Sequence, residues 1–212
     1  MWWRRFPLGS LWTNGYLVSD ETGHGFFVDP GGDPSEVLTA LEAPERRIVS
    51  LERVLLTHGH ADHIQGVDLL RERTGASVWI LQEDASILED PGENLSAYLG
   101  APFSCKTPRE LLRDGLVFAV GSLEVEVLAT PGHTPGSCCF FVRDGEERVL
   151  FSGDTLFARS VGRCDLPGGD ERALRRSLER LGTLPDDLRV LPGHGPETTL
   201  REERLQNPFW PR

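Results

Sequence analysis

The chain has 212 residues, a length that suits one domain with a large core, and we expect residues 1–212 to form a single domain. Its formal net charge is −11, and it has no run of Lys or Arg of the kind that binds a phosphate backbone, so nucleic acid is not an expected partner. The four cysteines show no CxxC spacing, which favours buried small hydrophobic residues in a reducing compartment. No apolar stretch has the length of a signal-peptide core or a membrane span. We therefore expect a soluble cytoplasmic protein without a membrane partner.

The first half of the chain predicts strands, followed by helices that alternate with strands. Period-2 patterns and turn residues predict strands at 2–8, 11–19, 25–29, 52–57 and 78–81. Asp33 is the expected N-cap of a helix that starts at Pro34 and ends near Ala43. Two more helices are expected at 63–73 and 83–88, and the buried face of the first is predicted to carry Ile64, Val67, Leu69 and Leu70.

The second half predicts a second set of strands. Residues 90–108 contain Pro and Gly with little periodicity, which is typical either of a binding loop or of an irregular surface crossing. Alternating patterns then predict strands at 116–120, 123–129, 138–142, 149–151 and 188–191. Cys138 and Cys139 are expected to face opposite sides of their strand. A helix is expected around 198–205. Because strands with helices occur twice, we predict an α/β (α+β) fold of two packed sheets with helices outside.

A dense polar cluster follows the apolar run Val54–Leu56. The segment Thr57–His63 reads THGHADH and holds three imidazoles and one carboxylate. Side chains two residues apart in an extended segment point to the same side, so His58 and His60 can bind one metal ion. Asp62 and His63 stand where the chain turns into the next helix and can reach a second ion. A solvated loop is the alternative, but the strand-to-helix context favours a metal site.

Three more polar residues stand where predicted strands end. His133 lies in the loop Thr130–Gly136, Asp154 follows the strand at 149–151, and His194 follows the strand at 188–191. Each is bracketed by Pro or Gly, residues that fix or free the backbone and can aim a side chain precisely. A single histidine of this kind is more often a packing or capping residue. Together with the cluster at 57–63, the three positions predict one shared metal centre.

These motifs, Thr57–His63, Thr130–Gly136, Gly153–Phe157 with Gly162-Arg163, and Pro192–Gly195, resemble the metallo-β-lactamase fold superfamily and specifically its short bacterial glyoxalase II-like hydrolases. The resemblance spans nearly the whole chain. It implies a four-layer αββα sandwich of two mixed sheets flanked by helices. It also implies that one metal is bound by His58, His60 and His133, the second by Asp62, His63 and His194, and that Asp154 bridges the two.

The resemblance further implies a metallohydrolase with two divalent cations, for which zinc is expected and iron or manganese are alternatives. Metal binding lowers the pKa of water to about 7, so a bridging hydroxide would attack the carbonyl of a small anionic thioester or related ester. S-acylglutathiones such as lactoylglutathione are the implied thioesters. Asp62 and Asp154 are the expected catalytic carboxylates, and Asp62 is also expected to orient the hydroxide.

Departures from the family pattern leave alternatives open. Only residues 195–212 follow the last expected ligand, so the C-terminal glutathione-binding helical domain of full-length relatives is not expected. Arg163 is the candidate for binding a substrate carboxylate, and a surface ion pair is the alternative. The segment Gly162–Asp165 also resembles persulfide dioxygenases, which hold one iron, and lactone hydrolases share the ligands. A non-catalytic metal-binding protein would lack a ligand, and none is missing. The oligomeric state and the natural substrate stay open.

Overall fold

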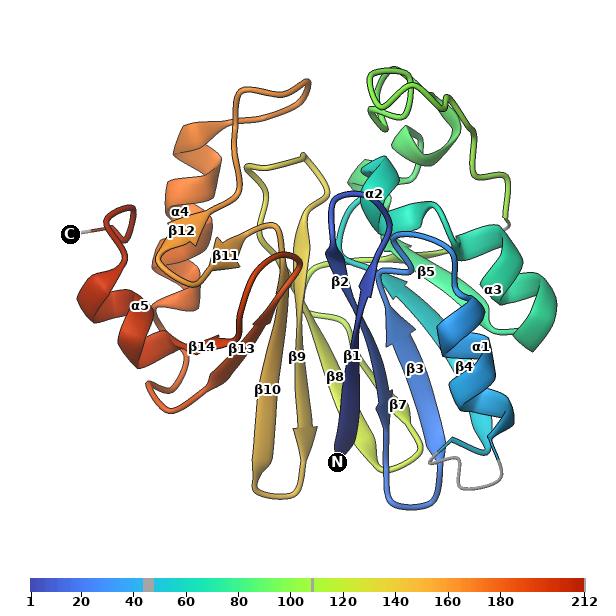
Figure 1. The fold of residues 1–212 in the computed structure, drawn as a ribbon. Helices are drawn as coiled ribbons and strands as arrows, with labels where there is room; N and C mark the ends of the chain where they lie inside the picture. The colour runs from blue at the N-terminus through green and yellow to red at the C-terminus, as the bar shows by residue number, and fades with distance from the viewer. Residues whose placement is uncertain (44–47, 108, 212) are drawn as a thin grey trace.

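Two six-stranded sheets pack face to face, and helices cover the outer face of each (Figure 1). The computed structural model describes residues 1–43, 48–107 and 109–211. This four-layer arrangement of two mixed sheets confirms the predicted fold class. Within the described ranges, no helix has both the length and the apolar character needed to cross a membrane.

The first sheet has the order β1-β2-β3-β4-β5-β6. Its strands β1 to β3 are antiparallel, whereas β3 to β6 run parallel to one another. Parallel neighbours need crossovers, and helices α1 and α3 supply two of them. The bounds are β1 Trp2–Leu8, β2 Thr13–Ser19, β3 His24–Val28, α1 Ser35–Glu42, β4 Ser50–Leu56, α2 Ala61–Ile64, α3 Val67–Thr74, β5 Ser77–Leu81, the 3-10 turns η1 Gln82–Asp84 and η2 Ile87–Glu89, and β6 Arg109–Leu112.

The second sheet has the order β14-β13-β10-β9-β8-β7, and its β10 and β13 are parallel neighbours. Because β9 runs antiparallel to both β8 and β10, the carboxyl ends of β8, β10 and β13 meet at one edge. The bounds are β7 Val117–Val120, β8 Leu123–Ala129, β9 Cys138–Asp144, β10 Glu147–Gly153, the small hairpin β11 Leu156–Phe157 and β12 Ser160–Val161, α4 Glu171–Leu181, β13 Arg189–Pro192, β14 Thr198–Thr199 and α5 Leu200–Gln206.

Hydrogen bonds join the two sheets at this same edge. The amide of Cys138, at the start of β9, donates to the carbonyl of Thr57 just after β4 (2.9 Å). The amide of Asn14, in β2, donates to the carbonyl of Gly193 just after β13 (2.7 Å). The ends of β4 and β13, which carry predicted metal ligands, are therefore held against the opposite sheet.

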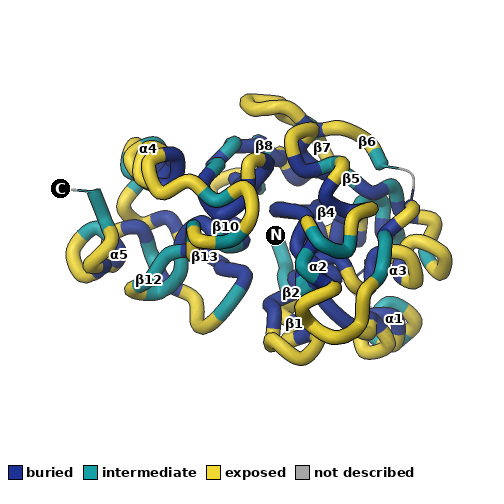
Figure 2. Tube along the Cα trace, turned by 90° about the horizontal axis from the view of Figure 1, so that it is seen from above, coloured by how far each residue is buried: buried dark blue, intermediate teal, exposed yellow. Residues whose placement is uncertain are grey.

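Alternating side chains divide the core into three layers. Phe26 packs between the sheets, while its neighbour Phe27 packs under helices α1 and α3. Cys138 likewise faces the space between the sheets, and Cys139 faces helix α4, as their neighbouring positions predicted. Burial of one such aromatic side chain contributes roughly 1.5–3 kcal/mol. Buried positions concentrate in the strands, and exposed positions lie on loops and outer helix surfaces (Figure 2).

The helix predicted at 63–73 is wrong as a single element. The structure has α2 and then α3, and the break falls at Gln65-Gly66. The amide of Gly66 donates to the carbonyl of Pro30 (2.7 Å), and a Cβ on Gly66 would lie 2.2 Å from the carbonyl oxygen of Gly32. Close contact with this loop therefore bends the chain. Leu69, predicted to be buried, is 41% exposed, whereas Val67 and Leu70 of the same helix are buried.

Other differences are smaller. Helix α1 is capped by Pro34 instead of Asp33, whose carboxylate accepts from the amide of Ser35. The helix predicted at 83–88 is two 3-10 turns. Helix α4 was missed, although Asp170 is an N-cap whose side chain accepts from two amides. The spacing of Leu174, Leu178 and Leu181 was the signal that could have found it.

Candidate metal centre

The seven predicted ligands lie at the edge where the ends of both sheets meet. Residues 57–63 leave β4 and enter α2, and the other three positions follow β8, β10 and β13. The residues His58, His60, His63 and His133 are at most 3% exposed. Separate strands of two sheets therefore deliver the histidines and carboxylates to one buried place.

Glycines make room for this convergence. A Cβ on Gly193 would lie 2.4 Å from the Asp154 carboxylate and 2.7 Å from the imidazole of His63. Gly153 has a φ of +48°, and a Cβ there would lie 2.4 Å from the hydroxyl of Thr57. A larger residue at 193 would push a candidate ligand out of place, and one at 153 would displace Thr57, the neighbour of His58.

The ligand atoms form three overlapping groups, and within each group they lie within 4.8 Å of one another. The groups are His58, His60 and His133; His58, His63 and Asp154; and Asp62, His63 and His194. Asp154 reaches both ends of the cluster, because its carboxylate lies 3.3 Å from His63 Nε2 and 3.6 Å from His133 Nε2. His194 Nε2 lies 3.2 Å from Asp62 Oδ2.

The cluster passes a test of whether it fits a metal. The Nε2 atoms of His58, His60 and His63 and the Oδ1 of Asp154 are buried and, within the described part of the chain, have no hydrogen-bond partner. Buried polar atoms in proteins are otherwise nearly always paired. Imidazole nitrogen and carboxylate oxygen are suitable ligands for zinc and for iron. The residues present therefore fit divalent cations.

Electrostatics prepare most of these groups to bind a cation. Burial and the neighbouring histidines lower the pKa of His58 well below its ordinary value. Burial and the charge of His133 lower the pKa of His60 to about 3, so both rings are neutral ligands at pH 7. Burial opposes the charged form of His63, yet the carboxylates of Asp62 and Asp154 outweigh burial and raise its pKa. A strongly negative local field therefore surrounds His63, which a metal ion can neutralise as well as a proton.

A buried carboxylate that the sequence analysis missed orients His63. Asp29 Oδ2 accepts from His63 Nδ1 (2.9 Å) and from the Thr57 hydroxyl (2.7 Å), while its Oδ1 accepts from the Thr57 amide (2.8 Å). With Nδ1 engaged, Nε2 is directed at the cluster. The sequence analysis placed Asp29 only at the end of the strand predicted at 25–29. Its place directly after a buried strand was the available signal.

Asp84 is a second missed carboxylate, and it joins two loops that carry ligands. It accepts from the amide of Gly59, from the amide of Gly136 and from the hydroxyl of Thr134, at 3.0, 2.6 and 2.7 Å. Gly59 stands between His58 and His60, and the other two donors belong to the loop of His133. Asp84 therefore sets the distance between these loops.

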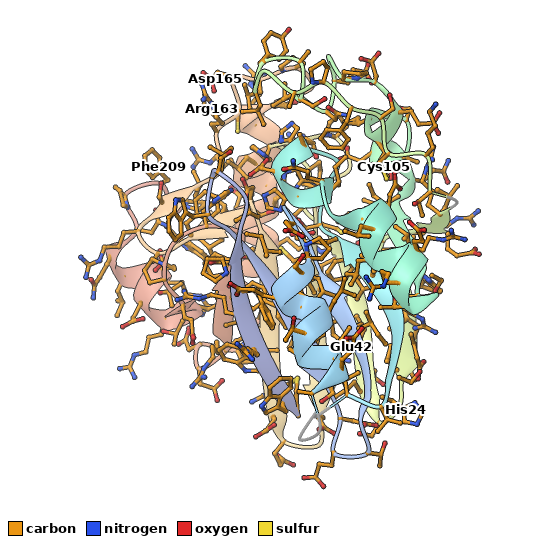
Figure 3. All side chains as sticks on the ribbon, turned by 45° about the vertical axis from the view of Figure 1, so that its right-hand side comes forward. His24, Glu42, Cys105, Arg163, Asp165 and Phe209 are labelled. Carbon is orange, nitrogen blue, oxygen red and sulfur yellow. The ribbon has the colours of Figure 1, made fainter. Side chains whose placement is uncertain are left out.

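A pocket of about 610 Å³ opens over the cluster, and its walls include Arg163. The Arg163 guanidinium forms two hydrogen bonds of 2.7 Å with Asp165, and both side chains are mostly exposed. Figure 3 shows Arg163 and Asp165 at the end of the molecule opposite His24. Cys164 packs against the layer under α4. Arg163 thus lines the pocket and also forms the surface ion pair that was one of its two predicted roles, while its binding of a substrate carboxylate stays a prediction.

Two mixed sheets with a buried cluster of histidines and carboxylates at one edge define a metal-dependent enzyme of the αββα class. The chain belongs to the metallo-beta-lactamase superfamily, whose family model matches residues 12–194. This finding confirms the family that the motifs resembled.

Relatives of known sequence cover almost the whole chain. Identity with the probable metallo-hydrolase YqgX of Bacillus subtilis is 38%, over 99% of this chain and 97% of the relative. Identity with the hydroxyacylglutathione hydrolase GloC of Haemophilus influenzae is 32%, over 96% of this chain and 95% of the relative.

Two solved structures are similar over the same extent. The BLEG-1 B3 metallo-beta-lactamase superposes with a TM-score of 0.91 at 37% identity, covering 99% of both chains. TTHA1623, solved in a di-iron-bound form, superposes with a TM-score of 0.83 at 38% identity, covering 97% of this chain and 99% of its own. Both have the fold described above.

Proposed function

We propose that this protein hydrolyses small anionic thioesters, S-acylglutathiones such as lactoylglutathione, or related esters, at a centre of two divalent cations. The observation that carries the proposal is the presence of two adjoining ligand triads with Asp154 between them. The triads are His58, His60 and His133, and Asp62, His63 and His194. Similarity to a hydroxyacylglutathione hydrolase supports a thioester as the substrate.

Hydrolysis adds water to the thioester carbonyl carbon and breaks the C–S bond, and it yields a carboxylate, a thiol and one proton. When bound, divalent cations supply Lewis acidity and lower the pKa of water to about 7. Asp62 lines the pocket, and its carboxylate is held by the Thr13 hydroxyl (2.9 Å). Its pKa stays below the ordinary value because the charges of His63 and His194 outweigh burial. An ionised Asp62 can accept a hydrogen bond from the attacking water and orient it.

Arg163 has the proposed role of binding a substrate carboxylate. It lines the pocket together with Asp62, and its guanidinium is mostly exposed. An anionic substrate would have to share this group with Asp165. Arg163→Ala should therefore raise KM more than it lowers kcat, because the contact is remote from the scissile bond.

Metal content per chain and turnover of S-D-lactoylglutathione test the proposal together. We expect about two metal ions per chain and activity that chelation abolishes. His60→Ala and Asp154→Ala should lower kcat/KM by more than the roughly 100-fold that loss of an outer-shell partner causes. His24→Ala is the matched control, because His24 is exposed, pairs with Glu52 and lies at the far end of the sheets (Figure 3). Full activity in His60→Ala or Asp154→Ala would contradict the proposal.

Two other activities are outcomes of the same test. One iron per chain with oxygen uptake on glutathione persulfide would assign the protein to the persulfide dioxygenases, which the segment Gly162–Asp165 also resembles. Turnover of lactones without turnover of thioesters would assign it to the lactone hydrolases. The ligand set itself accepts zinc, iron or manganese.

A further inference from the structure

We propose that the substrate carries an apolar acyl chain of several carbons, bound by an apolar rim around the metal centre; this inference rests on the proposed thioester or ester hydrolysis. The apolar rim consists of the six apolar or aromatic residues that line the pocket, Leu11, Leu95, Tyr98, Leu99, Leu166 and Pro167. It shares the pocket with the candidate ligands.

The rim exposes large apolar side chains of a kind that is normally buried in the core. Leu11 is 48% exposed, Tyr98 76% and Leu99 49%. They come from two segments far apart in the sequence, and both segments meet at one pocket. Contiguous exposed apolar surface of this kind marks a binding site more often than chance. An apolar ligand would remove these side chains from water and gain their transfer free energy.

Each part of the rim is tied to the metal centre by a hydrogen bond. Thr13, two residues after Leu11, donates to the carboxylate of Asp62 (2.9 Å). The carbonyl of Asn94, directly before Leu95, accepts from the amide of Ala61 (2.7 Å).

The third part of the rim, Leu166 and Pro167, is also tied to the metal centre by a hydrogen bond. The carbonyl of Arg163, three residues before Leu166, accepts from the Nδ1 of His133 (2.8 Å). All three loops are therefore positioned by the same residues that position the candidate ligands. Groups that grip a substrate beside a reacting centre need this kind of rigid support.

Leu95, which lines the pocket, has an unfavourable backbone conformation. Its φ is +70°, a region that leucine rarely adopts. Asn94 holds the backbone there, since its buried amide donates to the carbonyls of Leu88 and Phe103 and its Oδ1 accepts from the Ser96 amide. The surroundings thus enforce the placement of an apolar side chain at the pocket.

Charge explains why the rim suits the acyl side of the substrate. Among the pocket-lining residues that the structure describes, Arg163 is the one Lys or Arg, and Asp165 already engages it. Glutathione carries two carboxylates, for which an apolar wall offers no partner. The part of the substrate that covers the rim must itself be apolar, which leaves the acyl group.

A chain-length series tests the inference on the metal-loaded enzyme. S-acetyl-, S-butyryl-, S-hexanoyl- and S-octanoylglutathione keep the thiol constant while the acyl chain grows. Full burial of one methylene would raise kcat/KM about fourfold. On an open rim we expect about half of that free energy, which raises kcat/KM roughly twofold per methylene. The expected gain from acetyl to hexanoyl is therefore about 16-fold. A flat or falling series would overturn the inference.

A second series places the alkyl chain on the thiol of an acetyl thioester. We expect kcat/KM to change little, and a rise in this series alone would overturn the assignment of the rim to the acyl side. Leu11→Ser and Leu99→Ser should each reduce the hexanoyl-to-acetyl ratio by about threefold or more, because each removes apolar contact with the acyl chain. Leu205→Ser is the matched control, because Leu205 is 72% exposed on α5 outside the pocket. An unchanged ratio in both rim variants would contradict the proposal that the rim binds the acyl chain.

The two proposals fail differently. If the metal-loaded enzyme hydrolyses neither a thioester nor a related ester, the proposed function is wrong. If S-acylglutathiones are hydrolysed without a preference for longer chains, only the inference about the apolar rim is wrong.

Discussion

Replacing Asp84 with Ala should destabilise the protein and weaken its metal centre together. Asp84 is fully buried and accepts from two loop amides, those of Gly59 and Gly136, and from the Thr134 hydroxyl. The Ala variant leaves both amides buried without an acceptor, while Thr134 keeps the Ser137 hydroxyl at 2.7 Å as a partner.

The magnitude follows from the number of unpaired amides. Each costs about 1–3 kcal/mol, which gives roughly 2–6 kcal/mol. Burial raises the pKa of Asp84, so its charged form is unfavourable in the wild type and its removal offsets part of this loss. We therefore expect a loss in the lower half of the range, about 3 kcal/mol. For a protein of this size, the Tm should fall by roughly 6–12 °C.

Thermal unfolding followed by circular dichroism, with and without chelator, measures this change. Metal titration of the same protein should show a roughly 10- to 100-fold weaker site, because Asp84 spaces the loops of His58, His60 and His133. Asp90→Ala is the control, since Asp90 also accepts from an amide, that of Gly92, but is exposed. A Tm within about 2 °C of wild type, or an equal fall in the control, would refute the reasoning.

Two further predictions follow from buried carboxylates. Asp29→Asn replaces one acceptor of the His63 ring by a donor, so metal affinity should fall about 10- to 100-fold in titrations of metal-free protein, with little change in circular dichroism. Hydrogen bonds from the Ser122 amide and from Thr22 and His24 outweigh burial and lower the pKa of Asp20 to about 2. Its stabilisation, about 2 kcal/mol, is present above the unfolded value near 3.9 and is lost as the pH falls through about 2. Urea unfolding should therefore show Asp20→Asn to be less stable than wild type at pH 5 and nearly equal at pH 2; a constant difference would be inconsistent with this.

Local patterns made much of the centre predictable. The spacing of His58, His60, Asp62 and His63 is contained in six residues, so no tertiary contact is needed to notice it. The strands that deliver His133 and His194 were also visible from alternation and from the turns that follow. What these motifs have in common is that the chemistry and its backbone context are close together in the sequence.

Carboxylates that support the ligands could not be found in this way. Asp29 is an isolated acidic residue and Asp84 follows Glu83, and among the 33 Asp and Glu residues of the chain neither pattern stands out. Their roles depend on donors such as the Gly136 amide, which is 52 residues away from Asp84. The break between α2 and α3 was missed for the same reason, because it depends on contacts of Gly66 with Pro30 and Gly32.

The sequence alone determined which side chains are able to bind metal and on which strand ends they stand, because ligand chemistry and strand periodicity are local properties. Tertiary structure decided that they share one centre, since only the strand order of both sheets brings the ends of β4, β8, β10 and β13 to one edge. Tertiary structure also decided that the residues of the apolar rim lie together. Leu11, Leu95 and Leu166 have nothing in common in the sequence, and they meet because each loop is hydrogen-bonded to the metal-binding turn or to His133.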